Sequence, residues 1–468
     1  MLSNEIVLNY GAQVLRDFIP QKTIDEKKFL PLILPQKLPV IKNVKEKLLS
    51  ALEKPIGKQK PLSSLIKENY KDGDICIITD DHDRPNIHTR LLLPILVDLL
   101  LTTYHLPLTK IKVVIATGTH RPPTDDELKK ILGEQMFGKV NYVIHKCKEN
   151  NIEVGELNGQ KIKIDSVVYN SDIIIPLTDV ENHYFAGVAG GPKSFCPGVC
   201  DMDTIRYEHL QMFGPEGFAK NVGLGIMDKN PVFETKVRIV KTILESLRKQ
   251  GKQVYTIVSI IDTEDDLVYL EGGELFEAHR RAAEVLKNVW TVYTEKQADI
   301  IIAGASAWGV NLYQMGKATH AAYRAVKKGG TILVVAPCNQ SWGNEEFKNL
   351  MKIGMDELNK HDDKCRVSEA NRIKKALTKV VEVVSADYKI GKQKPVDIFQ
   401  ILNYLGWGNL HIIQDGIPES DYHLLPFLFW GKNTQSPQER LNTWVQKYLQ
   451  NKTITVLNNP GYLVKPLE

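Results

Sequence analysis

The sequence predicts an α/β protein of two domains, each built on a parallel sheet. Short apolar segments typical of buried strands alternate with amphipathic segments of helical length along most of the chain. Such alternation favours parallel βαβ units, in which helices cover both faces of the sheet. The 468 residues also exceed the usual content of a single hydrophobic core, which predicts two domains.

In the first domain, apolar segments predict strands and the segments between them predict helices. The expected strands are Asp74–Thr79, Lys112–Thr117, Ser171–Leu177 and Gln253–Ile261. The expected helices are Thr89–Thr103, one that begins at Asp125, Glu234–Lys249 and Ala278–Val289. Before the first strand, the Lys- and Pro-rich segment Gln36–Pro61 predicts a loosely packed arm.

A second series of strands and helices begins at Ala298. The expected strands are Ala298–Ser306, Thr331–Ala336, Val380–Ser385 and Leu410–Gln414, and the expected helices are Tyr313–Lys327, Asn344–Leu358 and Ala370–Leu377. We therefore expect two Rossmann-like α/β domains, an N-terminal one over 1–294 and a C-terminal one over 295–439. Within 440–468, the helix Arg440–Leu449 and a strand that begins at Thr453 could pack on either domain.

The composition excludes several classes of protein. The 60 basic and 56 acidic residues leave a formal net charge of +4, which gives no reason to expect nucleic acid or an anionic membrane as a partner. The most apolar run, Leu91–Leu101, contains Pro94 and Asp98 and is too short to span a bilayer. No signal peptide is apparent, and six cysteines are too few for a disulfide framework in a chain of this length. The expected location is the cytoplasm.

Polar clusters follow several of the predicted strands. These clusters are Asp80–Pro85, Thr117–Pro122, His183–His209 and Asn311–Lys317. In open α/β sheets, ligands bind outside the carboxyl ends of the strands. The sequence therefore predicts that the four clusters share one cleft, which we expect between the two domains.

The segment His183–His209 is the richest in groups that can carry out chemistry. It combines two histidines with a glycine-rich turn that carries Lys193. Glycines allow positive φ and close approach of the backbone to a ligand, while an amine and imidazoles supply an anchor, a proton carrier and a metal ligand. The segment is therefore typical of an active site.

Other interpretations of these residues remain open at this point. Asp81 could cap a helix and pair with Arg84, and the His120 ring could be satisfied by backbone groups. Cys196 and Cys200 with His209 suggest zinc, but a C-x3-C pair without a second pair is a weak signal. Gly190 and Gly191 with Lys193 suggest a phosphate loop, although the G-x4-G-K-[ST] spacing is absent. A transferase or binding protein that uses this loop for a phosphorylated or nucleotide ligand is the alternative function.

Taken in order, the clusters resemble the nickel-pincer lactate racemase family of 2-hydroxyacid racemases and epimerases. The D-x-x-R-P turn of that family matches Asp81–Pro85, and its G-T-H-R-P turn matches Gly118–Pro122. The signature H-x3-G-x2-G-G-x-K-x3-P-G matches His183–Gly198, a further histidine matches His209, and Y-Q-x2-K matches Tyr313–Lys317.

The resemblance implies an isomerase with a nickel-pincer nucleotide of the pyridinium-3-thioamide-5-thiocarboxylic acid mononucleotide type. This cofactor would be linked to Lys193, with Asp81, Gly190 and Gly191 contacting it and His209 completing the nickel ligands. Soft sulfur and imidazole donors in one plane suit Ni(II). His120 and His183 would act as alternate base and acid while a hydride leaves C2 of the substrate for the cofactor.

The resemblance also implies how a small 2-hydroxyacid would be held. Arg84 would bind its carboxylate, with Lys317 nearby and with Tyr313 and Gln314 lining the pocket. The sequence departs from the family at Asp83, at Val188–Ala189 and at Ser306–Trp308, and His82 and His88 add polar groups. We therefore expect a larger or more hydroxylated acid than lactate. Separate cofactor-synthesis proteins would load the enzyme, and a homodimer is a possible assembly.

Overall fold

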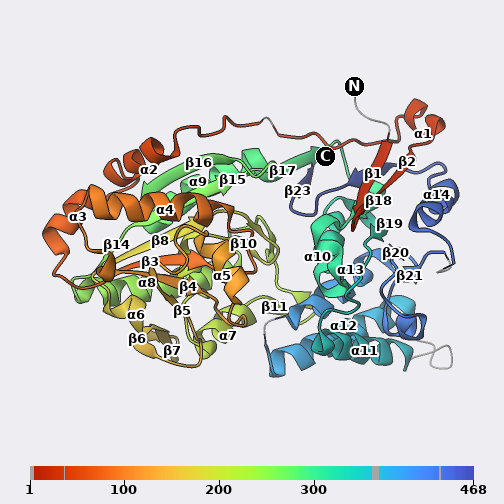
Figure 1. Cartoon of the computed structure of the whole chain (residues 1–468). Helices are drawn as coiled ribbons and strands as arrows, with labels where there is room; N and C mark the ends of the chain where they lie inside the picture. The colour runs from red at the N-terminus through yellow and green to blue at the C-terminus, as the bar shows by residue number, and fades with distance from the viewer. Residues whose placement is uncertain (1–4, 36, 361–367, 390, 432–433, 468) are drawn as a thin grey trace. The chain divides into compact units, whose positions relative to one another are not determined.

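The computed structural model describes residues 5–35, 37–360, 368–389, 391–431 and 434–467. The chain forms two compact units, and helices flank a largely parallel sheet in each (Figure 1). Unit 1 comprises Met1–Pro35, Phe213–Lys220 and Thr291–Glu468, and unit 2 comprises Gln36–Met212 and Asn221–Trp290. Among the described residues, no helix has the length and apolar character needed to cross a membrane.

The sheet of unit 2 has the strand order β16-β15-β8-β3-β4-β5, with β14 also paired to β8. Its strands are β3 (Ile75–Asp80), β4 (Ile111–Ala116), β5 (Asn141–Ile144), β8 (Ile173–Asp179), β14 (Gln253–Val254), β15 (Thr256–Ile261) and β16 (Leu267–Gly273). All pairings are parallel except that of β15 with β16. The sheet therefore presents the carboxyl ends of β3, β4 and β8 at one edge.

Helices cover both faces of this sheet, which explains why its strands are continuously apolar. Successive side chains of a strand point to opposite faces; accordingly Ile75 and Ile77 belong to one hydrophobic core, and Cys76 and Ile78 to the other. The first core is closed by α2 (Val44–Glu53), α3 (Leu62–Asn69), α4 (Ile87–Thr102) and α5 (Asp125–Leu132). The second is closed by α6 (Ser166–Asn170), α7 (Met202–Leu210) and α8 (Pro231–Lys249), while α9 (Leu275–Trp290) packs near the end of β15.

Short elements complete unit 2. They are the hairpin β6 (Asn151–Leu157) and β7 (Gln160–Asp165), the strands β9 (Asn182–His183), β10 (Ala186–Val188) and β13 (Gly223–Leu224), and the 3-10 turns η1 (Leu108–Lys110) and η2 (Gly191–Ser194). The glycine-rich segment thus leaves β8 through β9 and β10 and reaches Lys193 in η2.

The main sheet of unit 1 has the order β21-β20-β19-β18-β22, and all of its pairings are parallel. Its strands are β18 (Ala298–Gly304), β19 (Val326–Val335), β20 (Leu410–Ile413), β21 (Leu428–Phe429) and β22 (Ile454–Leu457). The smaller pairs are β1 (Glu5–Tyr10) with β2 (Gln13–Phe18), β11 (Phe213–Gly214) with β12 (Gly217–Phe218), and β17 (Thr291–Thr294) with β23 (Leu463–Pro466). The helices are α1 (Gln21–Asp25), α10 (Leu312–Tyr323), α11 (Glu345–Asn359), α12 (Glu369–Ala386), α13 (Gln393–Leu405) and α14 (Pro437–Tyr448), with the turns η3 (Ser306–Val310) and η5 (Glu419–Leu424).

Two expected elements differ in the structure. The expected strand Val380–Ser385 lies inside α12, because Leu377, Val380 and Val384 are buried at helical spacing rather than at the alternation of a strand. The segment Gln36–Pro61 is not a loose arm among its described residues. It contains α2, whose Leu48 and Leu52 are fully buried in the first core.

The units also differ from the expected domain ranges. The chain passes from unit 2 into unit 1 at Thr291, close to the expected boundary at residue 294. The first 35 residues, however, belong to unit 1. The reason is pairing over long sequence distances, since the backbone N–H of Leu30 donates to the carbonyl of Ile454 at 2.8 Å. The final segment likewise stays in unit 1, where β22 pairs with β18.

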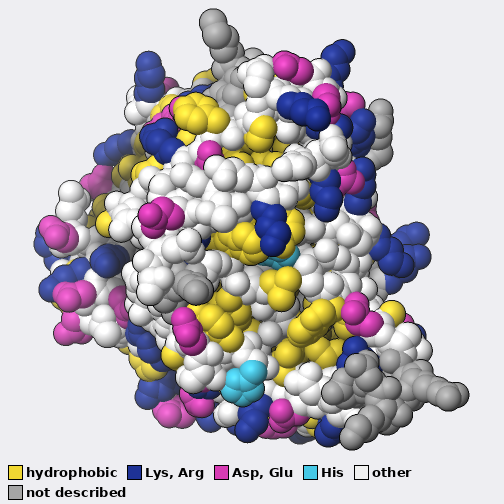
Figure 2. Space-filling model, turned by 90° about the vertical axis from the view of Figure 1, so that its right-hand side faces the viewer, with side chains coloured by type: hydrophobic (Ala, Val, Ile, Leu, Met, Phe, Trp, Pro, Cys, Tyr) yellow, Lys and Arg dark blue, Asp and Glu magenta, His cyan; other side chains and the backbone are white. Residues whose placement is uncertain are grey.

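Charged side chains of both signs are interspersed on the face shown in Figure 2. Lys and Arg lie beside Asp and Glu over this face, and hydrophobic side chains are scattered between them. The absence of one large single-sign area on this face agrees with the small net charge of +4.

Candidate active site

Three of the four predicted clusters meet at the carboxyl edge of the unit 2 sheet. Strands β8, β3 and β4 are adjacent and parallel, so the loops that follow them leave the sheet at the same edge. These loops carry Asp80–Pro85, Thr117–Pro122 and Asp179–Lys193. The backbone N–H of Gly118 donates to the carbonyl of Gly198 at 2.9 Å, which joins the second loop to the third.

The glycines of the third loop are required by packing against the protein itself. A Cβ at Gly190 would lie 2.6 Å from the carbonyl oxygen of Asp179, and one at Gly191 would lie 2.7 Å from Cβ of His279. Both residues also have positive φ, of 79° and 50°. The His279 ring lies 3.0 Å from the Ala189 carbonyl through Nε2. The loop that presents Lys193 is therefore held tightly against β8 and α9.

His120 forms a dyad with Asp81. The Asp81 Oδ2 lies 2.5 Å from His120 Nδ1, and the Asp81 residue is only 4% exposed. Burial acts to raise the pKa of Asp81, but the hydrogen bond to His120 and nearby cations lower it overall. A carboxylate on Nδ1 fixes the proton there and places the ring's lone pair on Nε2. Asp83 Oδ2 lies 3.4 Å from that Nε2.

His183 has the opposite pattern of hydrogen bonds. Its Nδ1 accepts the backbone N–H of Ala186 at 3.2 Å, which leaves the ring proton on Nε2. Burial, assisted by the charge of Lys193, lowers its pKa well below the usual value. The ring stacks on Tyr184 with 5.7 Å between the ring centroids, and it meets Phe185 edge to face with 4.6 Å between the centroids. His183 is therefore a neutral imidazole near pH 7.

Arg84 pairs with Glu181, a residue that the sequence analysis did not single out. Arg84 Nη1 lies 2.7 Å from Glu181 Oε1. Burial acts to lower the pKa of Arg84, but Glu181 and Asp80 raise it overall. On either side of this loop, Nε2 of His88 in α4 lies 3.4 Å from Oδ2 of Asp80 at the end of β3. The carboxylate of Asp81, which we expected to pair with Arg84, contacts His120 rather than Arg84.

The amine of Lys193 has a strongly lowered pKa. Burial lowers its pKa to about 7, with the positive charge of Arg84 acting in the same direction and Glu181 opposing it. An ordinary lysine, with a pKa near ~10.4, is almost wholly protonated at pH 7. The lowered pKa instead keeps a large fraction of the Lys193 amine neutral and nucleophilic at that pH.

His209 is oriented by its own helix. Its Nδ1 lies 3.1 Å from the Ile205 carbonyl, one turn earlier in α7, so the ring presents its lone pair at Nε2. Cys196 and Cys200 are buried, and burial raises the pKa of Cys196 well above its usual value, which disfavours a thiolate for zinc. Within the part of the chain that the structure describes, no three His, Cys, Asp or Glu side chains are grouped to hold a metal.

The fourth cluster lies in unit 1, on α10 after β18. The Tyr313 ring meets Phe347 edge to face at 5.8 Å. Lys317 Nζ lies 3.1 Å from the centroid of the Trp308 ring. The Oε1 of Gln314 is buried with no hydrogen-bond partner among the described residues. These three side chains therefore share one end of α10.

Sequence reasoning missed several buried charged residues. They are Glu208 and Lys236 in unit 2 and Lys394 in unit 1, together with the half-buried Glu181. Burial lowers the pKa of Lys394 to about 8, and its Nζ lies 5.6 Å from the centroid of the Tyr313 ring. Lys236 and Lys394 occupy apolar positions of otherwise amphipathic helices, and that placement was the available signal.

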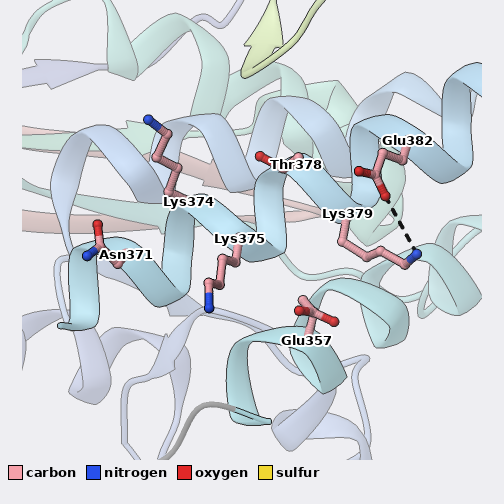
Figure 3. Close-up of a pocket in the computed structure, with 7 residues that line it drawn as sticks. All are labelled: Glu357, Asn371, Lys374, Lys375, Thr378, Lys379 and Glu382. Carbon is pink, nitrogen blue, oxygen red and sulfur yellow. Dashed lines mark ion pairs between the residues drawn. The ribbon is translucent and has the colours of Figure 1, made fainter. Parts of the chain in front are cut away.

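A groove of about 590 Å³ lies between α11 and α12, and none of the predicted site residues lines it (Figure 3). Its lining residues are Glu357, Asn371, Lys374, Lys375, Thr378, Lys379 and Glu382. Lys379 and Glu382 form an ion pair of 3.6 Å across one turn. The groove contains long, solvated side chains and has no buried group that would fix a ligand.

Comparison with known proteins places two family profiles on the chain. The profile described as the lactate racemase N-terminal domain matches residues 19–220, and that of the lactate racemase C-terminal domain matches 293–379. The chain is 31% identical over 311 residues to a lactate racemase of Thermoanaerobacterium thermosaccharolyticum, covering 65% of this chain and 68% of that protein. It is 29% identical over 302 residues to a lactate racemase of Lactiplantibacillus plantarum, covering 64% and 67%.

Solved structures share the fold over most of the chain. The lactate racemase apoprotein of T. thermosaccharolyticum superposes with a TM-score of 0.76 at 22% identity, covering 98% of this chain and 100% of that one. A Thermotoga maritima protein superposes with a TM-score of 0.60 at 17% identity, covering 86% and 96%. The arrangement of helices and parallel strands is thus shared with both proteins.

Proposed function

The chain belongs to the lactate racemase family, and we propose that it is a racemase or epimerase of a 2-hydroxyacid other than lactate. The ordered motifs and the two family profiles support an isomerase. They do not favour the alternative of a transferase or binding protein that uses the Lys193 loop for a phosphate or nucleotide.

The observation that carries the proposal is the amine of Lys193. A lysine that is to be joined covalently to a cofactor has to be nucleophilic, and a pKa of about 7 keeps a large neutral fraction at physiological pH. Its loop, which also carries His183, is held rigidly by close-packed glycines beside the loop of His120. A phosphate-binding lysine, by contrast, works as a permanent cation.

The residues of this chain fit a nickel-pincer nucleotide on two counts. Lys193 offers a neutral amine as the tether, and His209 offers an oriented imidazole lone pair at Nε2 as a metal ligand. When bound, the cofactor would supply a reversible acceptor for the hydride of the substrate's C2. Asp81, which we expected beside the cofactor, acts here through His120, while Gly190 and Gly191 would contact the cofactor through their backbone.

His120 and His183 are the proposed acid–base pair. His120, with its Nδ1 held by Asp81, has a lone pair at Nε2 and can accept the proton of the substrate hydroxyl. His183, with its proton on Nε2, can donate a hydrogen bond to a substrate oxygen. To act as the acid it must first take up a second proton, because a neutral imidazole does not release its ring proton near pH 7. Inversion at C2 requires the two roles to exchange between the two enantiomers.

Substrate orientation is assigned to Arg84 and to the α10 residues. The guanidinium of Arg84 has donors beyond the one that meets Glu181, and a substrate carboxylate can occupy them. Tyr313, Gln314 and Lys317 are the proposed pocket residues of unit 1. Asp83 lies near Nε2 of His120, and a carboxylate there favours a substrate with an extra hydroxyl donor over the methyl group of lactate.

Intact mass and metal analysis test the class of enzyme. Protein made together with cofactor-synthesis proteins is expected to carry a mass increment on Lys193 and near-stoichiometric nickel. Lys193→Ala should lose the increment while keeping its melting transition, and Lys374→Ala on the exposed face of α12 is the matched control. Wild-type protein that carries neither the mass increment nor nickel would contradict the proposal. It would favour the alternative of a protein that binds a phosphorylated or nucleotide ligand.

A screen across lactate, longer hydroxyacids and sugar acids tests the substrate. The holoenzyme is expected to racemise or epimerise one of the larger acids with a higher kcat/KM than lactate. Faster turnover of lactate than of any other acid would contradict this part of the proposal. A cytoplasmic location, loading by separate proteins and a homodimer complete the proposal.

A further inference from the structure

A buried carboxyl contacts the proposed nickel ligand, and a buried amine contacts that carboxyl. Neither group has a role in the reaction described above. Glu208 precedes His209 on α7 and is only 1% exposed. Its Oε2 lies 2.6 Å from His209 Nδ1. Its Oε1 lies 3.7 Å from Nζ of Lys236, which projects from α8 and is 2% exposed. The three side chains therefore form a row from α8 to the imidazole.

Burying the Glu208 carboxylate and the Lys236 ammonium group costs desolvation free energy. Neither oxygen of Glu208 has a hydrogen-bond partner among the described residues. The Nδ1–H of His209 is aligned on the Ile205 carbonyl, so its contact with Glu208 is electrostatic. Apolar residues of similar volume usually stabilise a protein as well as a buried ion pair does, or better. Stability alone therefore does not account for these two residues.

We infer that Glu208 and Lys236 are positioning residues that strengthen His209 as a metal ligand. The inference rests on the proposed function, which makes His209 Nε2 a nickel ligand. A metal at Nε2 draws electron density from the ring and makes Nδ1–H more positive. A carboxylate beside Nδ1 therefore stabilises the metal-bound ring more than the metal-free ring. Lys236 holds the carboxylate in place and compensates its charge when no metal is bound.

The direct test compares nickel release from holoenzyme variants. Glu208→Gln keeps the shape of the side chain and removes its charge. It is expected to weaken nickel retention against a chelator by 10- to 100-fold, the usual effect of removing such an outer partner of a metal ligand. Covalent loading of Lys193, measured by intact mass, should not change. Asp203→Asn, at an exposed position of the same helix, is the matched control and should release nickel at the wild-type rate.

A second comparison separates positioning from folding. Lys236→Met leaves the Glu208 carboxyl buried without its partner, and it should give the lowest melting temperature of the metal-free variants. In the double variant Glu208→Gln, Lys236→Met, nickel retention should equal that of Glu208→Gln, because Lys236 acts through Glu208. The absorption spectrum of the nickel centre should shift in Glu208→Gln and remain unchanged in the control.

Two results would overturn the inference. One is wild-type nickel retention in Glu208→Gln. The other is nickel loss that follows the melting temperature across all variants, which would show a purely structural role. In either case a loaded, active wild-type enzyme would leave the proposed function intact. A wild-type protein that takes up no nickel would instead overturn the proposed function and this inference together.

Discussion

His120 and His183 show how neighbouring backbone and carboxyl groups give the same side chain different chemistry. A carboxylate on Nδ1 makes His120 a base at Nε2, whereas a backbone N–H on Nδ1 leaves a proton on Nε2 of His183. Burial beside Lys193 also keeps His183 neutral. The difference between the two rings therefore comes from their partners, one of which is the side chain of another loop.

Asp81→Asn tests the dyad at the scale of one residue. The amide can still accept the backbone N–H of Asp83, as Oδ1 of Asp81 does at 3.3 Å, so the loop should keep its shape. It no longer stabilises the His120 ring in the form that accepts a proton. We expect kcat to fall by about 10² to 10⁴, the range for loss of one acid–base group. Racemisation assays would measure this.

Two further measurements make the Asp81→Asn result specific. Nickel content and covalent loading are expected to equal those of the wild type, since Asp81 acts through His120. Asp126→Asn, in the exposed first turn of α5, is the control and should keep full activity. Activity of Asp81→Asn within threefold of the wild type would remove the dyad from the mechanism.

Among the elements, the glycine-rich loop decides where Lys193 is placed. Its glycines were expected to let the backbone approach a ligand, but the positions a Cβ would occupy face the protein. At Gly190 that position is 2.6 Å from a backbone oxygen of β8, which cannot move easily. The loop is thus fastened to the sheet, and the amine is placed by the strand rather than by a flexible segment.

Gly190→Ala is the corresponding prediction for the loop. The methyl group would clash with the Asp179 carbonyl and the residue would keep a φ of 79°, so we expect a loss of about 1–3 kcal/mol in the free energy of unfolding. Covalent loading of Lys193 should slow as well. Gly159→Ala is the control, because Gly159 has a similar positive φ of 81° but open space where a Cβ would lie. The difference between the two variants therefore measures the effect of the clash. Equal stability and loading of the two variants would refute the packing argument.

At the scale of the whole molecule, unit 1 is assembled from distant parts of the sequence. Ile6 and Leu8 of β1 are fully buried in the same core as Ile300 and Ile302 of β18. The segment before residue 36 also pairs with β22 and with Tyr293 through backbone hydrogen bonds. The first strands are therefore part of the folding unit that contains residues 291–468.

A fragment of residues 291–468 is predicted to lack a cooperative thermal transition. It loses several side chains whose burial contributes about 1.5–3 kcal/mol each. A peptide of residues 1–35, supplied by fusion or in trans, should increase the helical signal and restore a melting transition in circular dichroism. The same peptide with Leu8→Asp is the control and should not. A fragment that melts like the full chain on its own would contradict the assignment.

The sequence by itself determined the family, the class of fold and most strands and helices. Motif residues adjacent in the chain define the three loops, and the periodicity of apolar residues defines the elements that carry them. The family resemblance is confirmed by the profile matches. The expected strand at Val380 was wrong because a run of β-branched residues does not by itself distinguish a strand from a buried helix.

Only the tertiary structure decided which side chains meet. In the structure, Asp81 contacts His120 rather than Arg84, and Arg84 pairs with Glu181. Lys236 of α8 pairs with Glu208 of α7, the helix that carries His209. These partners are far apart in the chain. Their contacts depend on how strands and helices pack together, and the local sequence carries no signal for that packing. The same holds for the Lys193 pKa, because burial and nearby charges arise only when separate segments close around one amine.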